Sequence, residues 1–127
     1  MDKHKNIVLF TLSFVITLIV MRFVLAFFRE VHDVNNFGPY NIHHALIGAF
    51  LLIGVIILWL CTAITHLTVL LAGIGSALVV DEMVYFIILT QGNYELYLGK
   101  ASFWGAVIIG GIVLLTTAII YYTTKKR

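Results

Sequence analysis

The sequence has few of the residues that soluble proteins place on their surfaces, because charged residues make up only 11% of its 127 residues. Soluble domains contain about 25% charged and about 45–50% apolar residues, whereas 61% of this chain is apolar. Small soluble domains keep a large fraction of their surface in water, so this composition excludes a soluble fold. A lipid bilayer removes the difficulty, because it is itself an apolar solvent.

Cysteine and proline each occur once. The lone cysteine, Cys61, can form no intrachain disulfide and belongs to no Cys-x-x-Cys motif, which argues against redox chemistry. The lone proline ends the run Asn35–Pro39, whose composition is typical of a turn. The formal net charge is only +2, and the sequence has no basic stripe of the kind that binds nucleic acid. We therefore expect no nucleic-acid partner.

Four apolar segments reach the length of about 20 residues that a helix needs to cross a bilayer. Their apolar runs are continuous rather than alternating, and backbone groups in lipid must be hydrogen bonded within their own segment, so helices are expected rather than strands. The predicted spans are residues 6–28, 42–63, 67–90 and 101–122. The sequence thus predicts one all-α integral membrane domain over residues 1–127, a four-helix transmembrane bundle.

Basic residues are concentrated at the two chain ends. Five of the eight Lys and Arg residues are Lys3 and Lys5 before the first span and 125–127 after the last. The two longer loops carry only Arg29 and Lys100. Cytoplasmic segments of membrane proteins are enriched in Lys and Arg, so we expect both termini in the cytoplasm. This predicts a multi-pass protein of the plasma (inner) membrane with membrane lipids as partners.

Three ionisable residues, Arg22, Asp81 and Glu82, fall inside predicted spans. Each costs about 2.5–3.5 kcal/mol near the centre of a membrane helix, and such groups usually face protein or water and find partners. At a rise of about 1.5 Å per residue, the three lie at one depth, in the outer half of the bilayer. We therefore expect Arg22 to pair with one of the carboxylates, either as a lock between the first and third helices or as part of a working site.

A second polar group is expected at the same end of the bundle. His43 and His44 open the second span, and Tyr85 lies one turn beyond the two carboxylates of the third. Adjacent residues of a helix point about 100° apart, so at most one of the two histidines is expected to face the bundle axis. We expect Arg22, both histidines, both carboxylates and Tyr85 to form one ion or ligand site that opens outward.

Small residues predict where the helices approach each other. Gly48 of the second span and Ala77 of the third are expected to let these antiparallel neighbours pack closely. The fourth span carries Ser102, Ala106 and Gly110 at four-residue spacing, which is typical of a helix-contact or dimer face.

A divalent metal ion is the cofactor that these residues would suit. Imidazole and carboxylate groups bind zinc, iron or manganese, and facing helices of a bundle can supply them. The tentative ligands are His43, His44, Asp81 and Glu82. Their spacing matches neither the H-E-x-x-H motif nor the Glu-x-x-His repeats of di-iron bundles.

Two stretches resemble a group of small prokaryotic four-span membrane proteins without a firm function. Residues 42–48, with the sequence IHHALIG, are similar to the group's I-H-H-x-x-x-G helix start. Residues 73–82, with the sequence GIGSALVVDE, are similar to its G-x-G-x-x-L-x-x-D-E motif, and residues 97–106 look like its fourth-span entry. The resemblance implies the architecture and singles out the two histidines and two carboxylates, but it implies no reaction.

Three functions follow from these residues. The first is binding or transport of a proton or divalent cation. It would need a homo-oligomer, because one chain of 127 residues is small for a transport pathway across the membrane. The second is a membrane metalloenzyme acting on a lipid or outer-leaflet substrate, with one carboxylate as general base. The third is a structural or accessory subunit in which the charges are architectural. The sequence does not decide whether the protein is an enzyme.

Overall fold

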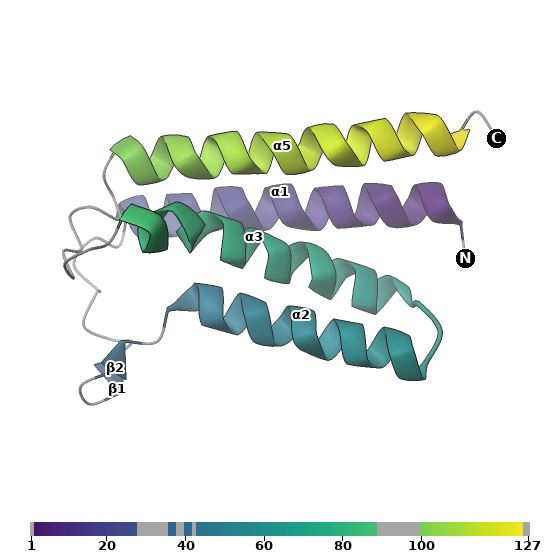
Figure 1. Cartoon of the computed structure of the whole chain (residues 1–127), viewed down its shortest axis with the longest axis horizontal. Coiled ribbons are helices and arrows are strands. Elements are labelled where there is room, and N and C mark those ends of the chain that lie inside the picture. Colours follow the sequence, from purple (N-terminus) through teal and green to yellow (C-terminus); the bar gives the residue numbers. More distant parts are fainter. Residues whose placement is uncertain (1, 28–35, 38–39, 42, 89–99, 126–127) are drawn as a thin grey trace.

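The computed structural model describes residues 2–27, 36–37, 40–41, 43–88 and 100–125, which form four long helices (Figure 1). Successive helices run in opposite directions, and both chain ends lie at the same end of the molecule. Between the first two helices, a two-residue strand β1 pairs antiparallel with β2. The bounds are α1 Lys3–Phe27, β1 Asn36–Phe37, β2 Tyr40–Asn41, α2 His44–Cys61, α3 His66–Ile88 and α5 Lys100–Lys125.

The predicted helical architecture is confirmed, and all four helices are long and apolar enough to cross a membrane. Their bounds differ from the predicted spans at the ends. Helix α2 begins at His44 rather than at residue 42, because His43 has an extended backbone with φ −74° and ψ 138°. Helix α5 continues to Lys125. Its last turns contain Thr123 and Thr124, whose hydroxyls donate to carbonyl groups of the preceding turn and so suit a helix in an apolar environment.

The distribution of polarity is the reverse of that in a soluble protein. Large apolar side chains lie on the outside, with Leu60 82%, Phe50 65% and Leu115 63% exposed. The fully buried side chains include Asp81 and Ser102. Soluble proteins rarely bury a charged residue so completely, whereas a helix bundle in lipid must turn such groups inward.

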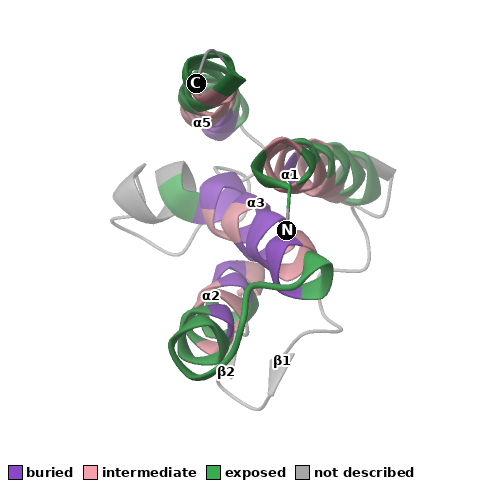
Figure 2. Ribbon diagram, turned by 90° about the vertical axis from the view of Figure 1, so that its right-hand side faces the viewer, coloured by how far each residue is buried: buried purple, intermediate pink, exposed green. Residues whose placement is uncertain are grey.

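Helix α3 is the centre of the bundle. It packs against α1, α2 and α5, which surround it in the view along the molecule (Figure 2). Half of its span is buried, against 17% or less in the spans of the other three helices. A residue of α3 can therefore face any of three neighbours, depending on which side of the helix it occupies.

Helices α2 and α3 approach closely through glycine. A Cβ atom added to Gly48 would lie 2.6 Å from the carbonyl oxygen of Gly75 and 2.8 Å from Cβ of Leu78, so only glycine fits there. The predicted role of Gly48 is confirmed, but the predicted role of Ala77 in this contact is wrong. Ala77 packs instead into a buried cluster with Phe14 of α1, because it lies on a different side of α3 from Gly75.

The connection between α2 and α3 is short and hydrogen bonded. Thr65 precedes α3, and its hydroxyl accepts from the N–H of Thr68 at 3.2 Å, while its own N–H donates to Thr68 Oγ1 at 3.1 Å. This reciprocal arrangement caps the start of α3 in the manner of a capping box. Trp59 of α2 also donates to Thr68 Oγ1, at 2.8 Å. The turn thus holds α2 and α3 as antiparallel neighbours, as the sequence predicts.

Candidate functional site

The two adjacent acidic residues of α3 have different sets of neighbours. Residues one apart in a helix are separated by about 100° around its axis, and α3 has neighbours on several sides. Asp81 contacts both Arg22 of α1 and His44 of α2, whereas Glu82 contacts the first turn of α2. Their side chains are only 0% and 5% exposed, so every charge on them must be balanced within the protein.

Arg22 of α1 forms an ion pair with Asp81, as the depth argument predicts. Its Nε donates to Oδ1 of Asp81, and its Nη2 donates to the backbone carbonyl of the same residue at 2.8 Å. Nη2 also lies 3.5 Å from both the carbonyl and the hydroxyl oxygen of Ser102 in α5. One guanidinium therefore connects three helices.

Ser102 is a site residue that the sequence analysis assigned only to helix packing. It is completely buried, and the buried residues of α5 are Ser102, Ala106 and Gly110, so the predicted contact face is confirmed within one chain. Small residues on this face let α5 approach Arg22. Its position in the sequence could have identified Ser102 as a site residue, since it lies in the first turn of α5 at the same end of the bundle as the carboxylates.

Both histidines contact the carboxylates, in contrast to the expectation that at most one would face inward. Nε2 of His44 lies 3.0 Å from Oδ2 of Asp81, and its Nδ1 lies 3.2 Å from Oε1 of Glu82. Nδ1 of His43 lies 3.1 Å from the same Oε1. The 100° rule fails because His43 precedes the helix, and its extended backbone directs the side chain independently of the helical repeat.

Glu82 also caps α2 from outside that helix. Its Oε2 accepts the backbone N–H of Ala45 at 2.8 Å, while His43, at the capping position, makes no side-chain cap bond. The first N–H groups of a helix lack partners within the helix and carry partial positive charge. A carboxylate on α3 thus satisfies the start of α2 and fixes its position along α3.

The contacts of His44 place one imidazole between the two carboxylates. An ionised carboxylate can only accept hydrogen bonds, and a neutral imidazole has one N–H and one lone pair. Nε2 of His44 is within hydrogen-bond distance of Oδ2 of Asp81, and Nδ1 lies 3.2 Å from Oε1 of Glu82. The ring can therefore share a proton with Asp81, and Glu82 is a second acceptor close to it.

The described charges of the cluster do not sum to zero. Among the residues that the structure describes, the guanidinium of Arg22 neutralises one of the two buried carboxylates, and one negative charge is left when both imidazoles are neutral. One added proton makes the cluster of Arg22, His43, His44, Asp81 and Glu82 neutral overall. Neutrality is favourable here because an uncompensated buried charge is strongly destabilising.

The geometry gives less support to a metal ion. Each of the four carboxylate oxygens already lies against a nitrogen, from Arg22, His44, His43 or the Ala45 backbone. Within the described part of the chain, no group of three or more His, Cys, Asp or Glu side chains is placed to hold a metal ion. The side chain of Tyr85, also predicted to belong to the site, lies outside the described residues.

Comparisons with protein-family models, with curated proteins and with solved structures give no match to this chain. The resemblance of residues 42–48 and 73–82 to a group of small prokaryotic membrane proteins stays a prediction. The case for function therefore depends on the geometry of the cluster.

Proposed function

We propose that the protein binds a proton reversibly at this cluster and, as a homo-oligomer, transports that proton across the plasma membrane. One observation carries the proposal: each ring nitrogen of His44 lies against an oxygen of a different buried carboxylate, Asp81 or Glu82. Chains of histidine and carboxylate groups within the membrane are typical of proton pathways. The imidazole bridges two acceptors, so a proton can pass from one carboxylate to the other through its ring.

A proton fits the cluster better than a divalent cation does. A calcium or magnesium site needs several oxygen ligands around the ion, whereas the oxygens of Asp81 and Glu82 already face nitrogen groups. The guanidinium of Arg22 adds a fixed positive charge that repels a second cation. A proton needs no coordination shell and occupies the space between atoms that are already in contact.

Orientation and assembly complete the proposal. Lys3, Lys5 and Lys125 lie at the end of the bundle that carries both termini, so this end is assigned to the cytoplasm. The cluster then lies toward the outer face. Helix α2 packs extensively on α3 alone and keeps large exposed apolar side chains such as Phe50 and Leu60, which leaves it available to a second copy.

The test is proton binding and proton flux by purified protein in liposomes. Infrared difference spectra between two pH values should show carboxylate and imidazole bands changing together, and an imposed potential should drive proton uptake. Glu82→Gln should remove the coupled spectral change and the flux, because the amide keeps an oxygen that can accept the Ala45 N–H but loses the exchangeable charge.

The matched control is Asp2→Asn, which neutralises an exposed carboxylate at the opposite end of the bundle. Asp2 accepts the backbone N–H of His4, and asparagine caps a helix start equally well, so this variant should keep the spectrum and the flux. A wild-type cluster whose bands do not change with pH would contradict the proposal. Reversible protonation without proton flux would restrict the proposed function to proton binding.

The contacts of Glu82 and Arg22 favour a second candidate, a structural or accessory subunit. Glu82 caps α2, and Arg22 joins α1 to α3 and α5, so the cluster also fixes the arrangement of all four helices. If this is its whole role, the wild type should show no pH-dependent carboxylate or imidazole bands and no proton flux. The metalloenzyme alternative predicts stoichiometric metal in the purified protein, which elemental analysis measures.

A further inference from the structure

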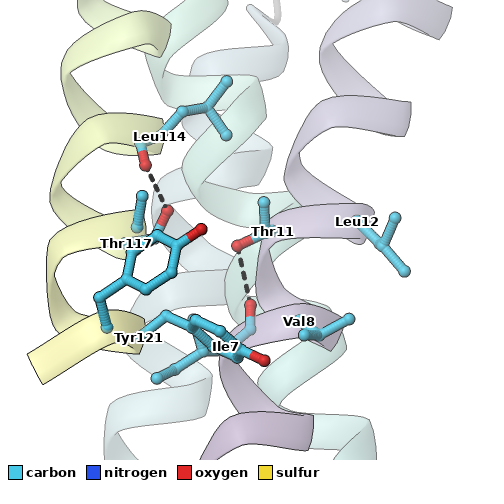
Figure 3. Close-up of a pocket in the computed structure, with 9 residues that line it drawn as sticks. Ile7, Val8, Thr11, Leu12, Leu114, Thr117 and Tyr121 are labelled. Carbon is cyan, nitrogen blue, oxygen red and sulfur yellow. Dashed lines mark hydrogen bonds between the residues drawn. The ribbon is translucent and has the colours of Figure 1, made fainter. Parts of the chain in front are cut away.

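A groove runs between α1 and α5 at the end of the bundle opposite the cluster (Figure 3). Its volume is about 320 Å³, and its walls include Val8 and Leu12 from α1 and Leu114 and Ala118 from α5. Val8 and Leu12 are 45% and 54% exposed, so the groove is open to the lipid that surrounds a membrane protein.

Two threonines line the groove without making it polar. The hydroxyl of Thr11 donates to the carbonyl of Ile7 at 2.8 Å, and that of Thr117 donates to the carbonyl of Leu114 at 2.9 Å, as the dashed lines in Figure 3 show. Each hydroxyl is thus satisfied within its own helix. The rest of the lining is aliphatic apart from Tyr121 and Tyr122, which suits an acyl chain.

A second cavity of about 440 Å³ adjoins the groove and contains one cationic side chain, Lys5, together with two histidines. It is lined by His4 and Lys5 of α1 and by His66 at the start of α3. The two cavities share Val8, Leu12 and Tyr121 as lining residues, so they are adjacent. The partial positive charge at the start of α3 adds to that of Lys5. An apolar groove therefore lies beside a cavity that offers Lys5 and two imidazoles to an anion.

We propose that this composite site binds one glycerophospholipid with an anionic headgroup. Its acyl chain occupies the groove between α1 and α5, and its phosphate lies among His4, Lys5 and His66. Charge complementarity and the apolar groove together select this occupant, since basic pockets between membrane helices on the cytoplasmic side suit anionic headgroups and each buried methylene adds favourable transfer free energy. The proposal does not depend on proton binding, because the cluster lies at the other end.

The test is native mass spectrometry of the protein equilibrated with equal amounts of phosphatidylglycerol and phosphatidylcholine. The wild type should retain phosphatidylglycerol preferentially. The double variant Lys5→Gln/His66→Gln should lower that preference about tenfold, as expected for the loss of basic groups near a headgroup. Both residues are exposed, so the variant should keep its melting temperature, and the two single variants repeat the test with smaller changes.

Two further variants test the contributions of the basic residues and of the apolar groove separately. Lys100→Gln removes an exposed basic residue at the opposite end and should leave the preference unchanged. Ala118→Trp fills the groove and should lower retention of phosphatidylglycerol although every basic residue is present. Equal retention of the two lipids by the wild type, or an equal loss in Lys100→Gln, would overturn the proposal. So would glycerol phosphate, if it displaced phosphatidylglycerol at equal concentration, because the cavity beside the groove would then bind the anion without the chain.

Discussion

The ionisable side chains at the two ends of the bundle differ in burial. At one end, Asp81 and Glu82 are almost completely buried and every carboxylate oxygen lies against a nitrogen group. At the other end, Lys5 and His66 are exposed beside an apolar groove. Buried charge requires partners of fixed geometry, whereas exposed charge at a membrane surface needs only water and headgroups. Variants should therefore affect stability strongly at the first end and weakly at the second.

The largest loss of stability is expected from Arg22→Ala. Removing one partner of a buried ion pair costs about 3–5 kcal/mol in soluble proteins, and here it removes the guanidinium from the buried carboxylate of Asp81 and breaks the contact with Ser102. Thermal unfolding in detergent should show a much lower midpoint, and Arg22→Lys should lower it less. The control is Lys100→Ala, an exposed site with an expected change within about 0.5 kcal/mol. Equal losses of stability in Arg22→Ala and Lys100→Ala would contradict the expectation that buried charge contributes more to stability than exposed charge.

A smaller loss is expected from Gly48→Ala, which tests whether the helices hold the cluster together. The new methyl would lie 2.6 Å from the carbonyl oxygen of Gly75, so α2 must move away from α3. Overpacking of this kind costs about 1–3 kcal/mol. Gly54→Ala is the matched control, because nothing lies within 4 Å of its added Cβ and alanine favours the helix by about 1 kcal/mol. If both variants unfold at the same temperature, the close contact does not exist.

The smallest effect is expected at the turn between α2 and α3, where Thr65 caps the start of α3. Loss of a side-chain cap typically costs about 1 kcal/mol, so Thr65→Ala should lower the unfolding midpoint slightly. Thr116→Ala is a suitable comparison, since the Thr116 hydroxyl donates only to Ile112 in its own helix. A Thr65→Ala protein as stable as the Thr116→Ala protein would show that the bond from the Thr68 N–H to the Thr65 hydroxyl contributes nothing.

The contact between Arg22 and Asp81 could be predicted because depth in a membrane follows directly from position along a helix. The same argument brought His44 close to the carboxylates. It could not identify Ser102, whose small side chain carries no charge. Nor could it identify the bond between Glu82 and the Ala45 backbone. Every residue except proline has a backbone N–H, so residue identity does not show which of them donates to a side chain.

The sequence by itself determined four apolar helices, their lengths and the charge difference between the two ends, because these depend on composition and on the fixed rise of a helix. Only the tertiary structure decided that α3 is the central helix, that Asp81 connects α1 to α2, and that Glu82 caps α2. Helices in lipid are chosen as partners by close packing and by hydrogen bonds rather than by burial of apolar surface. An apolar stripe therefore does not reveal which helix it meets, and Ala77 was assigned to the contact with α2 rather than with α1 for that reason.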